Sequence, residues 1–120
     1  MQIISGIYKG KKLEGFNIDG TRPTMNRVKE SLFAMIQNKI KNSVCLDLFA
    51  GSGSLGLEAL SNGAKECYFI DNNIKVIKVL NNNLKGVAGN IIVKSDFKAF
   101  LKNIDKNLIL FFLILHINLI

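Results

Sequence analysis

Apolar residues follow two different spacings along the chain, and the change falls near residue 43. The first residues, 2–16, alternate loosely between apolar and polar around a basic turn at Lys9, Gly10 and Lys11, which predicts a β-hairpin. From Thr24 onward, apolar residues recur at helical spacing. They predict a helix whose packing face carries Val28, Leu32, Met35, Ile36 and Ile40. Either Thr24 or Asn26 can cap the start of this helix.

Beyond residue 43, short apolar runs alternate with helical patterns. Strands are predicted at 44–48, 66–70, 91–93 and from residue 108 onward, and helices at 54–62, 73–84 and 97–104. The middle helix has an apolar side made of Ile74, Ile77, Leu80 and Leu84. This alternation predicts an α/β fold with a parallel sheet and right-handed crossovers. We therefore expect an N-terminal extension at 1–43 and a sheet-forming domain at 44–120.

Basic residues are concentrated in the leading part of the chain. The 120 residues carry a net charge of +7, and residues 1–43, with eight basic and three acidic side chains, account for +5 of it. Such a segment suits a polyanionic partner, because neutralising phosphates releases their counterions. A solvated, lysine-rich surface is the alternative interpretation.

Cysteines and apolar runs indicate the cellular setting. Cys45 and Cys67 lie in separate apolar runs without CxxC spacing or a nearby histidine, so we expect reduced, packed thiols and no metal site. Polar residues interrupt the start of the chain, so no secretory signal is predicted. The longest apolar run, 108–120, is shorter than the ~20 residues of a membrane-spanning helix. These features predict a cytoplasmic protein with no membrane role.

The stretch LDLFAGSGSLGLEAL at 46–60 places three glycines between a predicted strand and a predicted helix. Glycine tolerates positive φ and lets a ligand approach the backbone, while the following helix presents unpaired N–H groups to an anionic moiety. Gly51, Gly53 and Gly56 match the pattern G-x-G-x-x-G. Because NAD, FAD and S-adenosylmethionine sites all use this pattern, the match by itself leaves the ligand open.

Acidic residues at the ends of three predicted strands help to separate these ligands. Asp47 can face the cationic amino group of a methionine moiety but would repel a pyrophosphate, which favours S-adenosylmethionine. Asp71 can accept hydrogen bonds from both ribose hydroxyls, and this fits NAD equally well. Asp96 can accept from an adenine amino group while Phe97 stacks or packs. Since the carboxyl ends of parallel strands meet in one crevice, we expect these side chains to line one site.

Three segments together resemble one bacterial enzyme family. The opening MQIISGIYKGKKL, the stretch TRPTMNRVKESLF at 21–33 and the glycine-rich stretch are similar to those of the RsmD family, and the resemblance extends to about Phe112. Members of that family use S-adenosylmethionine to methylate the exocyclic N2 of one guanine in 16S ribosomal RNA. The resemblance implies a class I methyltransferase with a Rossmann-like sheet, whose partner is 16S ribosomal RNA or a partly assembled small subunit. We expect a monomer.

The resemblance also implies roles for the residues at matching positions. The cofactor S-adenosyl-L-methionine would contact Asp47, Phe49, Gly51, Gly53, Asp71, Asn72, Asp96 and Phe97. The basic hairpin and the segment that follows it would contact ribosomal RNA and close over the site. The contacting residues would be Lys9, Lys11, Lys12, Arg22, Thr24 and Arg27. The two arginines can instead be ordinary surface residues of a first helical turn. No metal is implied.

One motif of that family is absent. The Asp-Pro-Pro-Tyr motif, which would hold the target base after the fourth strand, has no counterpart, and the chain reads ILHINLI at 114–120. The nucleotides GATCCTCCATATAAATCTAATA encode Asp-Pro-Pro-Tyr-Lys-Ser-Asn in one frame and ILHINLI one base later. We therefore hypothesise a frameshift after about Phe112 that truncates the sheet, assign no catalytic residue, and expect an inactive chain. The alternatives are a non-catalytic nucleotide- or RNA-binding fragment and a dinucleotide-dependent oxidoreductase.

Overall fold

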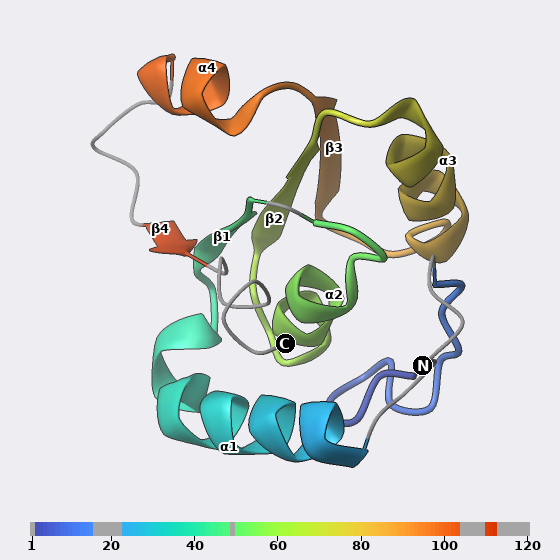
Figure 1. Ribbon diagram of the computed structural model, residues 1–120. Helices are drawn as coiled ribbons and strands as arrows, with labels where there is room; N and C mark the ends of the chain where they lie inside the picture. Colours follow the sequence, from blue (N-terminus) through green and yellow to red (C-terminus); the bar gives the residue numbers. More distant parts are fainter. Residues whose placement is uncertain (1, 16–22, 49, 104–109, 113–120) are drawn as a thin grey trace.

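The protein alternates helices and strands, with one long helix ahead of the first strand (Figure 1). The computed structural model describes residues 2–15, 23–48, 50–103 and 110–112. None of the helices in these ranges combines the length and hydrophobicity that a bilayer span requires. The helices are α1 Pro23–Ile40, α2 Ser54–Ser61, α3 Ile74–Asn83 and α4 Phe97–Lys102, and the strands are β1 Val44–Asp47, β2 Glu66–Asp71, β3 Asn90–Lys94 and β4 Leu110–Phe112.

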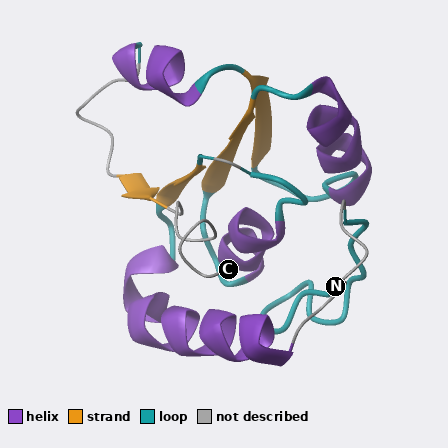
Figure 2. Ribbon diagram, in the orientation of Figure 1, coloured by secondary structure: helices purple, strands orange, loops and turns teal. Residues whose placement is uncertain are grey.

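The described strands form one parallel sheet in the order β3-β2-β1-β4 (Figure 2). β1 pairs with β2 with Val44 opposite Glu66, and β2 pairs with β3 with Cys67 opposite Asn90. β4 pairs with the other edge of β1. The chain therefore moves outward from β1 to β3 and then returns, which creates a topological switch point beside β1. The predicted α/β class with a parallel sheet is confirmed.

Alternating strand residues build a core on each face of the sheet, because successive side chains point to opposite faces. Cys45, Cys67 and Phe69 face α1, α2, α3 and the leading segment (residues 2–15), in a cluster with Ile3, Leu13, Phe33, Ile40, Leu57 and Leu80. Leu46 and Ile70 face the other side, where α4 contributes Phe97, Phe100 and Leu101. The leading segment and the sheet thus share one core, and the division into two domains at residue 43 stays a prediction.

The leading segment folds back on α2 instead of forming a full hairpin. Its predicted strands are reduced to one antiparallel bridge, between Gln2 and Lys12. Beside this bridge, Ile3 N–H donates to the Lys11 carbonyl over 3.0 Å and Gly10 N–H donates to the Ile3 carbonyl over 2.8 Å. Other amides bond to α2, because Ile4 N–H donates to Glu58 Oε2 over 2.9 Å and Tyr8 N–H donates to Ser61 Oγ over 2.9 Å. The predicted hairpin is therefore short, and the bonds to α2 take the place of a longer ladder.

Two apolar residues that were expected on packing faces are exposed, so these two predictions were wrong. Met35 of α1 is 81% exposed, whereas Phe33 and Ile40 are buried. Phe33 lies about 200° around the helix from Met35, so the buried face leaves Met35 toward solvent. Ile74 is 53% exposed because it begins α3 beyond the end of β2. The side chains of Val28, Leu32 and Ile36 lie outside the described residues.

Local capping determines where two helices begin. α1 begins at Pro23, whose restricted φ suits the first helical position, so Thr24 and Asn26 lie within the helix and not at the capping position before it. α3 begins after Asn73, whose side chain accepts a hydrogen bond from Lys75 N–H over 2.8 Å. This capped turn follows the end of β2 directly and therefore orders the residues at that edge of the sheet.

The two cysteines lie opposite each other on β1 and β2. Cys45 and Cys67 are both buried, and both are free thiols. Burial raises the pKa of the Cys67 thiol well above its ordinary value, and burial also raises the pKa of Cys45. Both thiols therefore stay protonated and pack as small apolar groups, as the sequence predicted.

Candidate functional site

The glycines after β1 form a tight turn into α2. Gly51 and Gly53 have φ values of 56° and 85°, which glycine adopts at little cost. Gly53 N–H donates to the Ala50 carbonyl over 2.8 Å, and Ala50 N–H donates to the Ile70 carbonyl over 3.2 Å. This glycine turn (residues 50–53) is therefore tied to β2 at the carboxyl edge of the sheet.

Asp47, the last residue of β1, is buried beneath the glycine turn. Its side chain has no exposed surface, and its Oδ2 accepts a hydrogen bond from Gly56 N–H in the first turn of α2 over 3.1 Å. A carboxylate at this position is favoured by the charge-assisted hydrogen bond and by the helix dipole. In this structure Asp47 positions the start of α2, and its contact with a ligand stays a prediction.

The third glycine of the pattern serves close packing. Gly56 is buried in α2, and a Cβ there would lie 2.3 Å from Phe69 Cε1 and 2.8 Å from Cys67 Sγ. Because residue 56 has no side chain, α2 can approach β2 closely. This approach holds the glycine turn against the end of the sheet.

Asp71 at the end of β2 links the glycine turn to the start of α3. Its Oδ2 accepts from Gly51 N–H over 3.4 Å, and its Oδ1 accepts from Asn73 N–H over 3.0 Å. The side chain is half-buried. An ionised carboxylate has about four lone-pair sites, so these two bonds leave acceptor capacity for the hydroxyl groups of a ligand.

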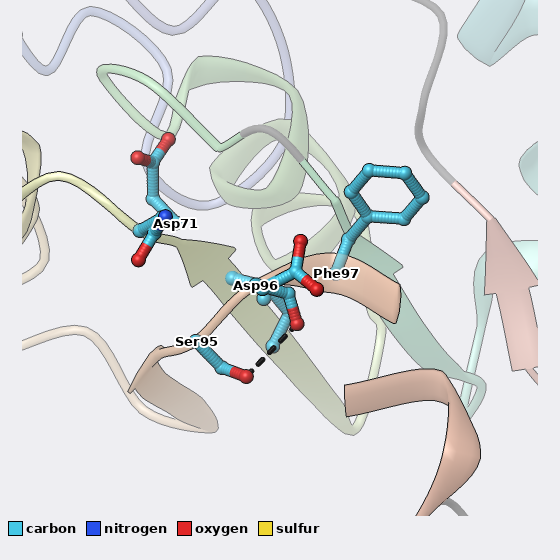
Figure 3. A pocket seen from close by; sticks show the side chains of 6 residues that line it. Asp71, Ser95, Asp96 and Phe97 are labelled. Carbon is cyan, nitrogen blue, oxygen red and sulfur yellow. Dashed lines mark hydrogen bonds between the residues drawn. The ribbon is translucent and has the colours of Figure 1, made fainter. Parts of the chain in front are cut away.

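A hollow of about 200 Å³ adjoins Asp71 and is lined by Ile70, Asp71, Asn72, Ser95, Asp96 and Phe97. These residues lie at and just after the carboxyl ends of β2 and β3. A hydrogen bond joins the two strand ends, because Ser95 N–H donates to the Asp71 carbonyl over 3.0 Å. Asp96 caps α4 by accepting from Ala99 N–H over 3.3 Å. Figure 3 shows the side chains of Asp71, Asp96 and Phe97 extending to the same side of the strand ends. Two carboxylates and an aromatic ring thus converge on one hollow.

The structure brings together part of the predicted cofactor site. The hollow is lined by four of the predicted residues, Asp71, Asn72, Asp96 and Phe97. Gly51 joins them through its hydrogen bond to Asp71. Asp47 and Gly53 are buried and are not among the residues that line the hollow, and Phe49 lies outside the described residues. That these side chains bind a cofactor stays a prediction.

The predicted RNA-contacting lysines lie away from the hollow. Their turn, around Gly10, is anchored to Ser61 at the last residue of α2, whereas the glycine turn precedes the first residue of that helix. The eight residues of α2 separate the two turns by about 12 Å. None of the residues that line the hollow belongs to the basic turn, and closure of this turn over the site stays a prediction. The remaining predicted contacts are Arg27, exposed on α1, and Arg22 and Thr24, whose side chains lie outside the described residues.

Sequence reasoning missed one residue beside the glycine turn. Asn83 at the end of α3 is 5% exposed, and its Nδ2 donates to the Ser52 carbonyl over 2.8 Å. Asparagine favours caps and turns over helix interiors. The run Asn81, Asn82 and Asn83 inside an apolar helical pattern is the signal that could have revealed it.

The groups around the hollow suit the nucleoside part of S-adenosylmethionine. Carboxylates accept from ribose hydroxyls and from an adenine amino group, and the ring of Phe97 offers a packing surface. Pockets for whole ligands begin at roughly 300 Å³. The hollow is smaller than this, so its volume suits one part of such a ligand, for example a nucleoside. The adenosine of NAD would make similar contacts.

Comparisons with known proteins identify the family. The family described as Conserved hypothetical protein 95 matches residues 1–113. The Ribosomal RNA small subunit methyltransferase D of Haemophilus influenzae is 48% identical over 85 residues, which cover 71% of this chain and 44% of the relative. The solved structure of yhhF from Escherichia coli is similar with a TM-score of 0.74 and 38% identity, over 84% of this chain and 55% of that chain.

A more distant structure shares the fold. A SAM-dependent methyltransferase from Agrobacterium tumefaciens matches with a TM-score of 0.57 at 22% identity, over 69% of this chain and 28% of that chain, and this likeness shows the fold alone. The match to yhhF, described as a methyltransferase, carries the fold class, an incomplete Rossmann-like sheet of the class I methyltransferase type. The chain spans about half the length of the curated relatives it matches. The match over residues 1–113 shows that the chain belongs to the family described as Conserved hypothetical protein 95, which is the RsmD family.

Proposed function

We propose that the hollow and the glycine turn form the cofactor site of an S-adenosylmethionine-dependent methyltransferase that modifies N2 of a guanine in 16S ribosomal RNA. The observation that carries this proposal is the convergence of Asp71, Asp96 and Phe97 at the carboxyl edge of the sheet. The family and the Haemophilus influenzae relative, named for small-subunit ribosomal RNA, support the choice of substrate.

Each wall of the hollow has a separate task in this proposal. Asp71 accepts from the ribose hydroxyls, Asp96 accepts from the adenine amino group, and Phe97 packs against the adenine ring. Gly51 allows the methionine part to approach the backbone closely. Asp47 holds α2 in position from below. The bound cofactor supplies a methyl carbon that its sulfonium activates toward a nucleophilic nitrogen.

The residues that would orient the guanine are not among those the structure describes. The family motif Asp-Pro-Pro-Tyr would supply a carboxylate and a stacking ring, but residues 114–120 read ILHINLI. Without these groups the exocyclic nitrogen is not held in line with the methyl carbon. The sequence at 114–120 favours a second candidate function, a non-catalytic nucleotide- or RNA-binding chain.

Ligand-induced stabilisation distinguishes the proposed cofactor from a dinucleotide. We expect S-adenosylhomocysteine to raise the melting temperature, because a ligand at 100 times its Kd stabilises the folded state by about 2.7 kcal/mol. We expect NAD at the same concentration to leave the melting temperature unchanged. Differential scanning calorimetry measures both. Stabilisation by NAD equal to that by S-adenosylhomocysteine would contradict the proposed cofactor.

Salt-dependent RNA binding tests the basic turn. Replacing Lys9 and Lys11 by glutamine should lower the slope of log K against log salt by about 2, since each phosphate contact contributes about 1. A filter-binding titration of a 16S ribosomal RNA fragment at several salt concentrations measures this slope. Lys98 and Lys102, on α4, provide a control pair with the same change of charge. Equal slopes for the two pairs would indicate a solvated lysine surface.

A further inference from the structure

Asn83 joins two parts of the chain that are far apart in sequence. Its Nδ2 donates to the Ser52 carbonyl of the glycine turn over 2.8 Å and to the Glu14 carbonyl of the leading segment over 2.9 Å. Its Oδ1 accepts from Glu14 N–H over 2.8 Å. One buried side chain therefore holds both backbone groups of Glu14 together with the middle of the glycine turn.

The burial of Asn83 makes this arrangement costly to break. Its side chain is 5% exposed at the end of α3. A buried polar group that loses its partner suffers the full desolvation penalty, so the three hydrogen bonds favour one arrangement of turn and segment. Any movement of the Ser52 carbonyl must therefore be transmitted to Glu14 or break a bond.

Glu14 connects the glycine turn to the part of the leading segment that follows the basic turn. The same leading segment carries the basic turn, which the bonds to Glu58 and Ser61 fix on α2. Glu14 lies beyond that turn, on the side toward the segment that leads into α1. The leading segment is thus connected to the glycine turn in two ways. Residues before the basic turn bond to α2, which follows the glycine turn, and Glu14 after the basic turn bonds to Asn83.

We propose that Asn83 is a positioning residue that couples binding of S-adenosylmethionine at the glycine turn to rigidity of the leading segment, the proposed RNA-contacting part of the chain. This inference rests on the proposed function. Cofactor contacts hold the backbone of the glycine turn, Asn83 then holds Glu14 more firmly against it, and the basic segment, already bonded to α2, becomes more rigid before RNA arrives. By reciprocity, RNA held by that segment tightens cofactor binding by the same factor.

A pair of substitutions at Glu14 tests the link without altering α3 or the hollow. Glu14→Pro removes the N–H that donates to Asn83, whereas Glu14→Ala keeps both backbone groups and removes only an exposed side chain. We expect Glu14→Pro to weaken S-adenosylhomocysteine binding about tenfold, within the usual range of coupling between sites. Glu14→Ala should bind like the unchanged chain. Isothermal titration calorimetry gives the Kd values.

Hydrogen–deuterium exchange supplies a readout that a merely structural role would not change. In the unchanged chain, S-adenosylhomocysteine should slow exchange at residues 9–15, which do not line the hollow. Asn83→Asp keeps the acceptor for Glu14 N–H but loses both donated bonds, and should abolish this protection. Asn82→Asp, which adds the same charge at an exposed neighbouring position, should keep it. Circular dichroism melts verify that each variant is folded.

The outcomes separate this inference from the proposed function. If the unchanged chain releases no binding heat with S-adenosylhomocysteine, the proposed function fails and the inference falls with it. If it binds and Glu14→Pro matches Glu14→Ala, the inference alone is overturned. Ligand-dependent protection of residues 9–15 that persists in folded Asn83→Asp would also overturn it. Loss of affinity in Glu14→Pro together with loss of protection in Asn83→Asp supports it.

Discussion

Replacing Gly56 with alanine is expected to lower the free energy of unfolding by about 2 kcal/mol. The new Cβ would lie 2.3 Å from Phe69 Cε1 and 2.7 Å from its Cζ, and Phe69 is fully buried. Overpacking a core costs up to about 3 kcal/mol, and the higher helix propensity of alanine returns about 1 kcal/mol of this. Urea unfolding followed by circular dichroism measures the difference.

A second substitution shows whether the contact with Phe69 is the cause. Phe69→Leu removes ring atoms from the position that the new Cβ would occupy. In the Phe69→Leu background, Gly56→Ala should therefore cost less, with a coupling of about 1 kcal/mol between the two changes. If the two effects simply add, or if Gly56→Ala alone does not destabilise the chain, close approach of α2 to β2 is not what requires glycine at this position.

Replacing Asp71 with alanine is expected to weaken S-adenosylhomocysteine binding about 100-fold. The change removes the proposed acceptor of the ribose hydroxyls and leaves the N–H groups of Gly51 and Asn73 without that partner. Hydrogen bonds to a charged group contribute about 1.5–3 kcal/mol, and each 1.4 kcal/mol corresponds to about a tenfold change in Kd. Isothermal titration calorimetry on the folded variant measures the loss.

Glu66 is the matched control for Asp71. It is the first residue of β2, at the opposite end of the same strand, so Glu66→Ala makes the same type of change far from the hollow. We expect Glu66→Ala to bind S-adenosylhomocysteine with unchanged affinity. Equal affinities for the two variants would show that the hollow beside Asp71 does not hold the nucleoside.

The helices and strands could be predicted because they depend on local pattern and local chemistry. Short apolar runs separated by polar and glycine punctuation predicted β1, β2 and β3 to within about two residues. Asn73 and Asp96 cap the helices they precede, as short polar side chains do. Gly51 and Gly53 adopt the positive φ that a tight turn requires.

The packing faces of the helices were less predictable. Met35 fits a helical stripe, yet α1 buries Phe33 and Ile40 instead. Apolar residues at helical spacing predict that a helix has an apolar face. Which of these residues are buried depends on the elements that pack against the helix. The predicted hairpin is shorter than expected for the same reason, since some amides of the leading segment donate to α2 and others pair across the segment.

In the candidate site, too, some residue positions could be predicted from the sequence and others could not. Asp71 ends β2, and Asp96 and Phe97 come just after β3. Because the carboxyl ends of parallel strands lie at one edge of the sheet, the convergence of these residues could be predicted. Asp47 also ends a strand, yet its carboxylate accepts a hydrogen bond from Gly56 N–H and is buried. The direction of a side chain at a strand end depends on the nearest donor, and that donor is set by how α2 packs.

The sequence by itself determined the alternation of strands and helices, the glycine turn and the end of the sheet where the acidic residues gather, because each of these follows from periodicity, backbone preference and chain direction. The tertiary structure alone decided that Asp47 supports α2, that the basic turn lies at the far end of that helix, and that Asn83 bridges the glycine turn and Glu14. These features join residues distant in the chain, and such contacts depend on how the elements pack rather than on any local pattern.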